Sequence, residues 1–167
     1  FIFLANELPA QSFYGENPLV LTYSIVARDL DTGEMGVAVQ SHWFSVGSIV
    51  SWGEAGVGVV ATQSFVNPAF GPNGLELLKS GMSADQVVDK LIAEDEGRDV
   101  RQLAIIDVNG NVKSYTGRNC IPGAGNIVGE NYSVQANLML NDKVPTAMSK
   151  SFEESTGPLA ERLMAAL

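Results

Sequence analysis

The sequence predicts an α+β fold, a four-layer α-β-β-α sandwich of two mainly antiparallel sheets flanked by helices. Three observations favour it. Apolar patterns of strand and helix period come in blocks, in the order four strands, two helices, at least three strands and two helices. Turn signals inside the strand blocks indicate hairpins, which favour antiparallel sheets over a parallel βαβ sheet. With 167 residues, 46% hydrophobic and 17% charged, the chain has the size and composition of one globular domain.

The first two strands form a hairpin. Residues 22–29 and 36–41 have strand character, and Asp29, Thr32 and Gly33 are residue types that a tight turn selects. Side chains two apart on a strand point to the same face, so we expect Thr22 and Ser24 to be neighbours.

Residues 46–52 and 56–63 predict the next two strands, separated by residues 53–55. Val37 and Val39 alternate with Gly36, Ala38 and Gln40, which leaves one face small, and glycine alternates with valine in 56–63, which implies close backbone approach on one side. We expect the two sheets to face each other across these Gly/Val surfaces.

Helical periodicity follows. Gly71-Pro72 starts a helix that stops at Ser80-Gly81, where glycine is the expected C-terminal residue. Ser83 and Gln86 match a capping box that opens a second helix through about Glu94.

Strand character returns in 101–107 and 111–116, joined by Asn109-Gly110, a strong hairpin signal. A further strand is expected over 132–139. Residues 143–167 predict two helices broken at Gly157-Pro158.

Composition excludes several function classes. A net charge of -9 with scattered Lys and Arg offers nucleic acid no basic patch. No apolar run is long enough to span a bilayer, so no membrane insertion is expected. One cysteine and one histidine cannot make a zinc site, and there is no phosphate-binding G-x-x-x-x-G-K-[ST] loop, so we expect no metal and no cofactor.

Residues 1–21 are expected to be an N-terminal extension or a signal remnant. Their apolar start, Phe1 to Ala5, and the following Leu8 to Gln11 look like the tail of a secretory signal, but a basic n-region and an initiator Met are missing. The alternative is that these residues pack on the domain or on a neighbouring chain. Localisation therefore stays open between the cytoplasm and export.

Several motifs together resemble one family. They are Thr22 to Asp29, Gly36 to Ser41, Trp52 to Gly58, Ala61-Thr62-Gln63 with Asn67-Pro68 and Gly71-Pro72, and Cys120-Ile121-Pro122. The sequence resembles the uncharacterised bacterial and archaeal family called domain-of-unknown-function 1028. The resemblance implies an Ntn-hydrolase-like (proteasome-like) fold. Some members carry a peptidoglycan-binding domain, which implies cell-wall amide chemistry by association.

The chain departs from the family pattern at both ends. Family members begin close to the Thr-x-Ser strand, whereas 21 residues precede Thr22 here. Members also continue past the final Leu-Ala-Glu-Arg-Leu helix into further strand sequence. We therefore expect 22–167 to be a single Ntn-hydrolase-like domain that lacks its C-terminal strands.

Thr22 and Ser24 are the catalytic candidates. The resemblance implies a nucleophile at the head of the first core strand, and in N-terminal-nucleophile enzymes the residue's own α-amine takes the hydroxyl proton. The peptide bond to Leu21 blocks this amine in Thr22, so the mechanism requires cleavage before Thr22. The alternative is a β-branched residue that simply begins a strand.

Ser41, His42, Gln63, Asn67 and Cys120 are the candidate substrate-binding residues. His42 could serve Ser24 as a base, but Asp29 and Asp31, which would orient it, lie at the opposite end of the hairpin. Asn137 could join Gln63 and Asn67 in binding an amide or carboxylate; equally, these amides could satisfy backbone groups at strand ends.

Cys120 lies in a loop rich in glycine and proline, where functional residues concentrate. Arg118 could activate its thiolate, whereas a small buried thiol is the simpler interpretation.

Two functions follow from these observations. The first is an amidohydrolase of the Ntn type that acts on a small amide or peptide. The second is a non-catalytic binding or assembly domain on the same scaffold, with 1–21 covering the cleft or docking on a partner. Apolar strands, two Trp and the hydrophobic start also suggest a homodimer.

Overall fold

The computed structural model describes residues 21–167. This part of the chain is a mixed α+β domain with two antiparallel four-stranded sheets and five α-helices, as expected for the fold class. The expected extension or signal remnant lies outside the described residues except for Leu21.

The first sheet has the strand order β2-β1-β8-β7. Its strands are β1 (Thr22–Arg28), β2 (Met35–Ser41), β7 (Gly125–Gly129) and β8 (Tyr132–Asn137). Thr22, at the head of the central strand β1, is opposite Ser41 on one side and Asn137 on the other.

The second sheet has the order β3-β4-β5-β6. Its strands are β3 (Ser51–Glu54), β4 (Gly58–Ser64), β5 (Arg101–Asp107) and β6 (Val112–Thr116). Gln63 and Gln102 are paired across the two central strands.

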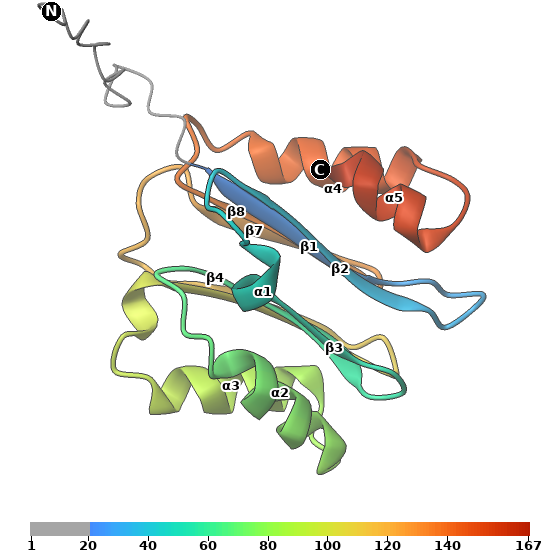
Figure 1. Ribbon diagram of the computed structural model, residues 1–167, viewed down its shortest axis with the longest axis horizontal. Helices are drawn as coiled ribbons and strands as arrows, with labels where there is room; N and C mark the ends of the chain where they lie inside the picture. Colours follow the sequence, from blue (N-terminus) through green and yellow to red (C-terminus); the bar gives the residue numbers. More distant parts are fainter. Residues whose placement is uncertain (1–20) are drawn as a thin grey trace, which may run out of the picture.

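The helices are α1 (Gly47–Val50), α2 (Phe70–Lys79), α3 (Ala84–Glu94), α4 (Val144–Glu154) and α5 (Leu159–Ala166), with a short 3-10 helix at Arg98–Val100. Figure 1 shows α4 and α5 over the outer face of the first sheet and α2 and α3 over the outer face of the second. The inner faces of the sheets face each other, and α1 lies at their edge.

Three buried clusters hold these layers together. One joins α2 and α3 to the second sheet, and another joins α4 and α5 to the first. The third lies between the sheets and includes Val26, Ala61 and Ile106. Alternation along each strand produces this division, because even-numbered residues of β1 face the second sheet and odd-numbered ones face the helices.

The predicted turns, the capping box and the break between the last two helices are confirmed. The Asp29-to-Gly33 and Asn109-Gly110 turns connect antiparallel strands, with Gly33 at φ 74° and Gly110 at φ 87°. Both halves of the Ser83 and Gln86 capping box are formed at the start of α3. The last two helices are separated at Gly157-Pro158 as expected.

The strand predicted over 46–52 is wrong in its first part. Residues 47–50 form α1, and β3 begins only at Ser51. Val46, Ile49 and Val50 are three and four residues apart, which is helical spacing, and all three pack against the layer between the sheets. This tertiary contact outweighs the β-branched character of the segment.

One strand and one strand limit also differ from expectation. β7 was not predicted, because the sequence from 118 to 125 indicates a loop and β7 begins directly at its end. The strand expected over 132–139 ends at Asn137, where Leu138 has a left-handed φ of 59°.

The expected glycine contact between the sheets is also wrong. A Cβ on Gly36 would lie 2.6 Å from Leu163 Cδ1 of α5, and one on Gly58 would lie 2.6 Å from Leu78 Cδ1 of α2. Gly36 and Gly58 therefore allow the covering helices to pack close to the sheets. The valines that alternate with them, such as Val37 and Val59, pack between the two sheets.

A candidate functional site at the head of β1

A cavity of about 430 Å³ opens where β1 begins. Thr22, Ser41 and Asn137 lie in one row across the first sheet, and Gln63 reaches the cavity from the second sheet. The remaining lining residues are His42, Trp43, Val46, Ile49, Val50, Ser64, Phe65, Val66, Ile121 and Leu138. A few hydroxyl and amide groups therefore converge inside apolar walls, an arrangement typical of small-molecule sites.

Unusual backbone conformations gather at this cavity. Ser64 and Leu138, which line it, have φ angles of 69° and 59°, and Ser45, in the loop between Trp43 and Val46, has φ 54°. Non-glycine residues in this region are uncommon and cluster at functional sites. The conformations therefore make this cavity the candidate functional site.

A second cavity of about 510 Å³ lies at the opposite end of the hairpin, around Gly33, Met35 and Gly53. None of the seven candidate residues lines it.

Thr22 is held by its neighbour on β2. Its side-chain oxygen lies 2.8 Å from Ser41 Oγ, and the Trp43 N–H donates to that Ser41 oxygen at 3.0 Å. Thr22 is 8% exposed. Ser41 thus fixes the direction of the Thr22 hydroxyl at the cavity.

His42 lies beside the peptide group that precedes Thr22. Its backbone N–H donates to the Leu21 carbonyl oxygen at 3.3 Å. Its ring Nδ1 is 3.3 Å from the same oxygen and 3.2 Å from the Leu21 nitrogen. With a proton on Nδ1, His42 directs two donors at the Leu21 carbonyl; without one, Nδ1 accepts the Leu21 N–H.

Ser24 shares the inner face of β1 with Thr22, but it does not line the cavity and is completely buried. Its hydroxyl donates to Gln63 Oε1 at 2.7 Å and accepts from Gln135 Nε2 at 2.7 Å. The Ser24 hydroxyl therefore already donates one hydrogen bond and accepts another inside the protein. Its hydrogen-bond partners are these two glutamines and not His42.

Gln63 continues this network toward the second sheet. Its Nε2 donates to Gln102 Oε1 at 2.9 Å, and Asn137 Nδ2 donates to the same oxygen at 3.0 Å. Gln102 Nε2, with two protons to donate, lies 3.0 Å from Thr116 Oγ1 and 3.2 Å and 2.9 Å from the carbonyl oxygens of Gly125 and Ala136. A continuous set of amide side chains therefore backs the cavity.

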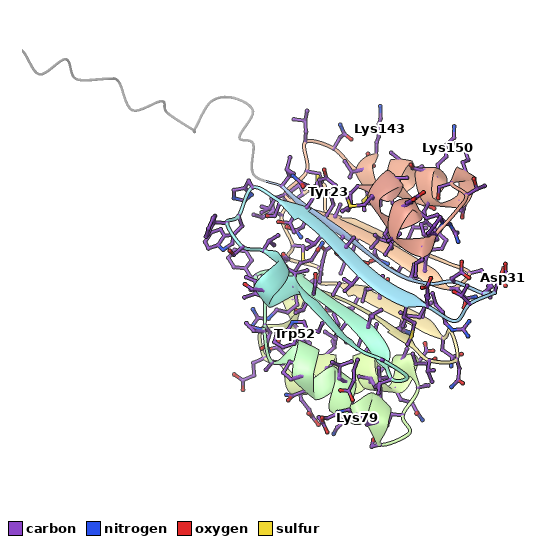
Figure 2. The ribbon with its side chains drawn as sticks, turned by 45° about the vertical axis from the view of Figure 1, so that its right-hand side comes forward. Tyr23, Asp31, Trp52, Lys79, Lys143 and Lys150 are labelled. Carbon is purple, nitrogen blue, oxygen red and sulfur yellow. The ribbon has the colours of Figure 1, made fainter. Side chains whose placement is uncertain are left out.

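The acids considered as partners for His42 lie far from it. Figure 2 shows Asp31 at the tip of the β1-β2 hairpin, at the other end of β1 from Tyr23. Asp29 accepts hydrogen bonds within its own turn, and the bond from the Thr32 backbone is the main reason why its pKa lies below the ordinary value.

Asn67 is not brought to the cavity. Its Oδ1 accepts the Ala69 N–H at 3.1 Å just before α2, and its backbone oxygen accepts from Thr62 at 3.3 Å. Its amide therefore satisfies a backbone group, as the alternative interpretation described.

Cys120 lies behind the cavity wall and is partly buried. Its sulfur accepts from Ser64 Oγ at 3.6 Å and donates to the Arg101 carbonyl at 3.4 Å. Arg118 instead pairs with Asp99 at 2.7 Å. The structure thus links Cys120 to Ser64 and to the Arg101 backbone, while the Arg118 guanidinium is hydrogen-bonded to Asp99.

Arg101 anchors that same wall. It donates to the Phe65 carbonyl and, at 2.8 Å, to the Asp95 carboxylate. The bond from Arg101 is the main cause of the lowered pKa of Asp95.

Two further observations concern residues 21–167. No set of three or more His, Cys, Asp or Glu side chains there is grouped as a metal site would require. None of the helices in this range has the length and apolarity needed to cross a membrane.

Sequence reasoning missed Gln102 and Gln135, which tie the candidate residues together. The available signal was polar residues at every second position of apolar strands: Ser133, Gln135 and Asn137 alternate with buried Val134 and Ala136.

Comparison with known proteins agrees with the resemblance noted from the motifs. The crystal structure of protein SPO2555 from Silicibacter pomeroyi, a DUF1028 protein, is similar with a TM-score of 0.84 and 31% identity. The match covers 87% of this chain and 65% of that one, so the chain spans less than two thirds of its relative. No curated protein matches the sequence. Because the model of the family of unknown function DUF1028 matches residues 22–167, the chain belongs to that family.

Proposed function

We propose that this protein is an Ntn-type amidohydrolase with an Ntn-hydrolase-like fold, acting on a small amide or peptide. Cell-wall amides are among the substrates to test. The observation that carries the proposal is the Thr22 hydroxyl, at the head of a central strand, in a cavity of about 430 Å³ and 2.8 Å from Ser41 Oγ.

Activation begins with cleavage before Thr22. Thr22 Oγ1 attacks the Leu21 carbonyl carbon, the bond from that carbon to the Thr22 nitrogen breaks, and the nitrogen takes a proton. Water then hydrolyses the resulting ester, which leaves a Leu21 carboxylate and a free amine and hydroxyl on Thr22. The two donors of His42 are suited to stabilise the negative charge that develops on the Leu21 oxygen.

Substrate cleavage would use the same hydroxyl. The free Thr22 amine takes the hydroxyl proton as Oγ1 attacks the substrate carbonyl, and the proton passes to the leaving amine. Water hydrolyses the acyl-enzyme and restores Thr22. In this proposal Ser24 acts through Gln63 as a positioning residue, since its own hydroxyl is fully hydrogen-bonded.

The test is an intact-mass measurement on the purified full chain, followed by an acylating probe and peptide mapping. We expect cleavage between Leu21 and Thr22 and a label on the peptide that begins at Thr22. Thr22→Ala should abolish both, whereas Ser24→Ala should retain the label on Thr22. If removing everything before Thr22 with a site-specific protease yields a folded chain that takes no label, the enzyme proposal fails.

A non-catalytic binding domain is the second candidate. The observation that favours it is the mixture of hydroxyl, amide and apolar side chains that line the cavity, which suits ligand binding whether or not the bond before Thr22 is cleaved. A chain that stays full length, takes no label and still binds small amides would support this alternative.

A further inference from the structure

We propose that the cavity at the head of β1 selects an uncharged ligand with an apolar group and an N–H donor, and that Asn137 Oδ1 accepts this N–H. The inference deepens the proposed function by naming its substrate class and rests on it to that extent. Binding itself can be measured without catalysis.

Two backbone carbonyls determine which end of the Gln102 side-chain amide is the nitrogen and which is the oxygen. Gln102 Nε2 lies 2.9 Å from the Ala136 oxygen and 3.2 Å from the Gly125 oxygen. Backbone carbonyls only accept hydrogen bonds, so this end of Gln102 must be its nitrogen. Its Oε1 therefore faces Gln63 and Asn137.

Asn137 must then present its own nitrogen to Gln102, at 3.0 Å. This leaves Oδ1 as the free end of Asn137. Among the described residues Oδ1 has no hydrogen-bond partner, although Asn137 is only 1% exposed. A buried acceptor without a donor is unfavourable. An N–H group of a ligand in the cavity would donate the hydrogen bond that Asn137 Oδ1 lacks.

The position of Asn137 suits a substrate amide. Asn137 lines the cavity and is paired with Thr22 across β1 and β8. A ligand N–H on Asn137 would bring the adjoining carbonyl carbon close to the Thr22 hydroxyl.

While the bond between Leu21 and Thr22 is intact, the described residues give the cavity no fixed charge. The lining residues within 21–167 include no Asp, Glu, Lys or Arg, and the one among them that titrates near neutral pH is the exposed His42. A carboxylate or ammonium ion would lose hydration there without gaining an opposite charge. Charged ligands are therefore disfavoured.

The walls are suited to an apolar group. Ile49, Val66 and Ile121 line the cavity with Trp43 and Phe65. Transfer of an alkyl chain from water to these side chains is favourable. Together, the walls and the acceptor describe a neutral alkyl or aryl amide.

Four small probes test this on the full chain. Hexanamide has the alkyl group and the N–H donor. Methyl hexanoate is neutral and lacks the donor, and hexanoate and hexylammonium carry opposite charges. Binding is measured at neutral pH by protein-observed NMR titration, and the same spectra record any conversion of hexanamide to hexanoate.

We expect hexanamide to bind about tenfold more tightly than methyl hexanoate, the effect of one hydrogen bond. The two ions should bind more weakly still, and the Asn137 side-chain amide resonance should shift with hexanamide alone. Equal binding of the ester or of either ion, or no movement of any cavity resonance with any probe, overturns the inference.

Asn137→Leu should remove the preference for hexanamide over the ester. Asn126→Leu is the matched control, because Asn126 bonds to Thr116 and Ser114 in the same polar layer without lining the cavity. It should keep the preference. If Asn137→Leu does not fold, the four-probe series on the unmodified chain still decides.

The two proposals fail in different ways. Selective binding without hydrolysis or labelling contradicts the enzyme and leaves the ligand class standing. Hydrolysis combined with unselective binding contradicts the ligand class only.

Discussion

Three glutamines lie between the sheets, Gln63 and Gln135 at 1% exposure and Gln102 at 0%. Such polar side chains are seldom fully buried, and burial is tolerated when their hydrogen bonds are made. Gln102 has the most polar neighbours of the three, since its oxygen accepts from two side-chain amides and its NH2 group lies within hydrogen-bond distance of three oxygens. At the residue scale it is the connecting point between the sheets behind the cavity.

Gln102→Leu tests this role. The substitution leaves the nitrogens of Gln63 and Asn137 without an acceptor and two carbonyl oxygens without this donor. Each unsatisfied buried group costs roughly 1–3 kcal/mol, so from the two side-chain nitrogens alone we expect the free energy of unfolding to fall by at least about 2 kcal/mol in urea denaturation. Gln40→Leu, on an exposed position of β2, should change it by less than about 0.5 kcal/mol. Equal losses in both variants would contradict the role.

At the element scale, the covering helices approach the sheets where a strand lacks a side chain. A Cβ on Gly58 would lie 2.5 Å from the Ile106 carbonyl oxygen as well as near Leu78 of α2. The backbone oxygen belongs to the neighbouring strand β5 and has little freedom to move. Gly58 therefore determines how closely β4, β5 and α2 pack.

Gly58→Ala should lower the free energy of unfolding by about 1–3 kcal/mol, since one added methyl group overfills the contact. Gly47→Ala is the matched control, because a Cβ there meets nothing within 4 Å. Thermal and urea unfolding of the two variants compare them directly. A stable Gly58→Ala chain would show that β4 can shift away from α2.

The link between Asp95 and Arg101 predicts a pH dependence. Hydrogen bonding from Arg101 lowers the folded pKa of Asp95 below its ordinary value of 3.8, so the carboxylate contributes stability above that value. The contribution is lost as pH falls from 3.8 through the lower folded pKa. Asp95 and Arg101 side chains are only 13% and 20% exposed, which limits screening by solvent.

We expect Asp95→Asn to be less stable than the unmodified chain by about 1 kcal/mol at pH 7. The difference should shrink below pH 3.8 and disappear in stronger acid, as followed by urea denaturation at a series of pH values. Asp142→Asn, at an exposed position, controls for the loss of one charge. If the difference in the free energy of unfolding stayed constant into acid, the loss of stability would come from altered packing and not from the charge of Asp95.

At the scale of the whole molecule, large apolar side chains are exposed near the cavity. Trp43 is 63% exposed, Phe44 is 92% exposed and Leu140 is 82% exposed. Phe44 follows a cavity residue and Leu140 lies two residues beyond one. Large exposed apolar side chains beside a cavity point to contact with another molecule.

The homodimer remains a prediction, and this surface is where we expect it to form. Light scattering during size-exclusion chromatography should give twice the 17.8 kDa chain mass at high concentration. Phe44→Ser should shift the protein toward monomer, while Met164→Ser, at a 68% exposed position of α5, should not. A monomer at every concentration, or dissociation by both variants alike, would contradict this interface.

Short-range features were predictable because few residues determine them. The Asn109-Gly110 turn and the Ser83 capping box depend on local conformational preference and hydrogen bonding. The segment 46–52 was mispredicted because its conformation depends on distant residues, against which Ile49 and Val50 pack. β7 was missed for a different reason: it pairs with β8 in a short hairpin, but the loop-like sequence from 118 to 125 that leads into it does not indicate a strand.

The sequence by itself determined the family, the α+β class, the hairpins with clear turn signals and the shared face of Thr22 and Ser24, since these follow from motifs and from the two-residue period of a strand. Only the tertiary structure decided which of the two hydroxyls reaches a cavity. Thr22 lies at the end of β1, where the inner layer opens, whereas Ser24, two residues further in, is enclosed by Gln63 and Gln135. The reason is physical: alternation determines the face of a residue, but exposure depends on the elements that assemble around it.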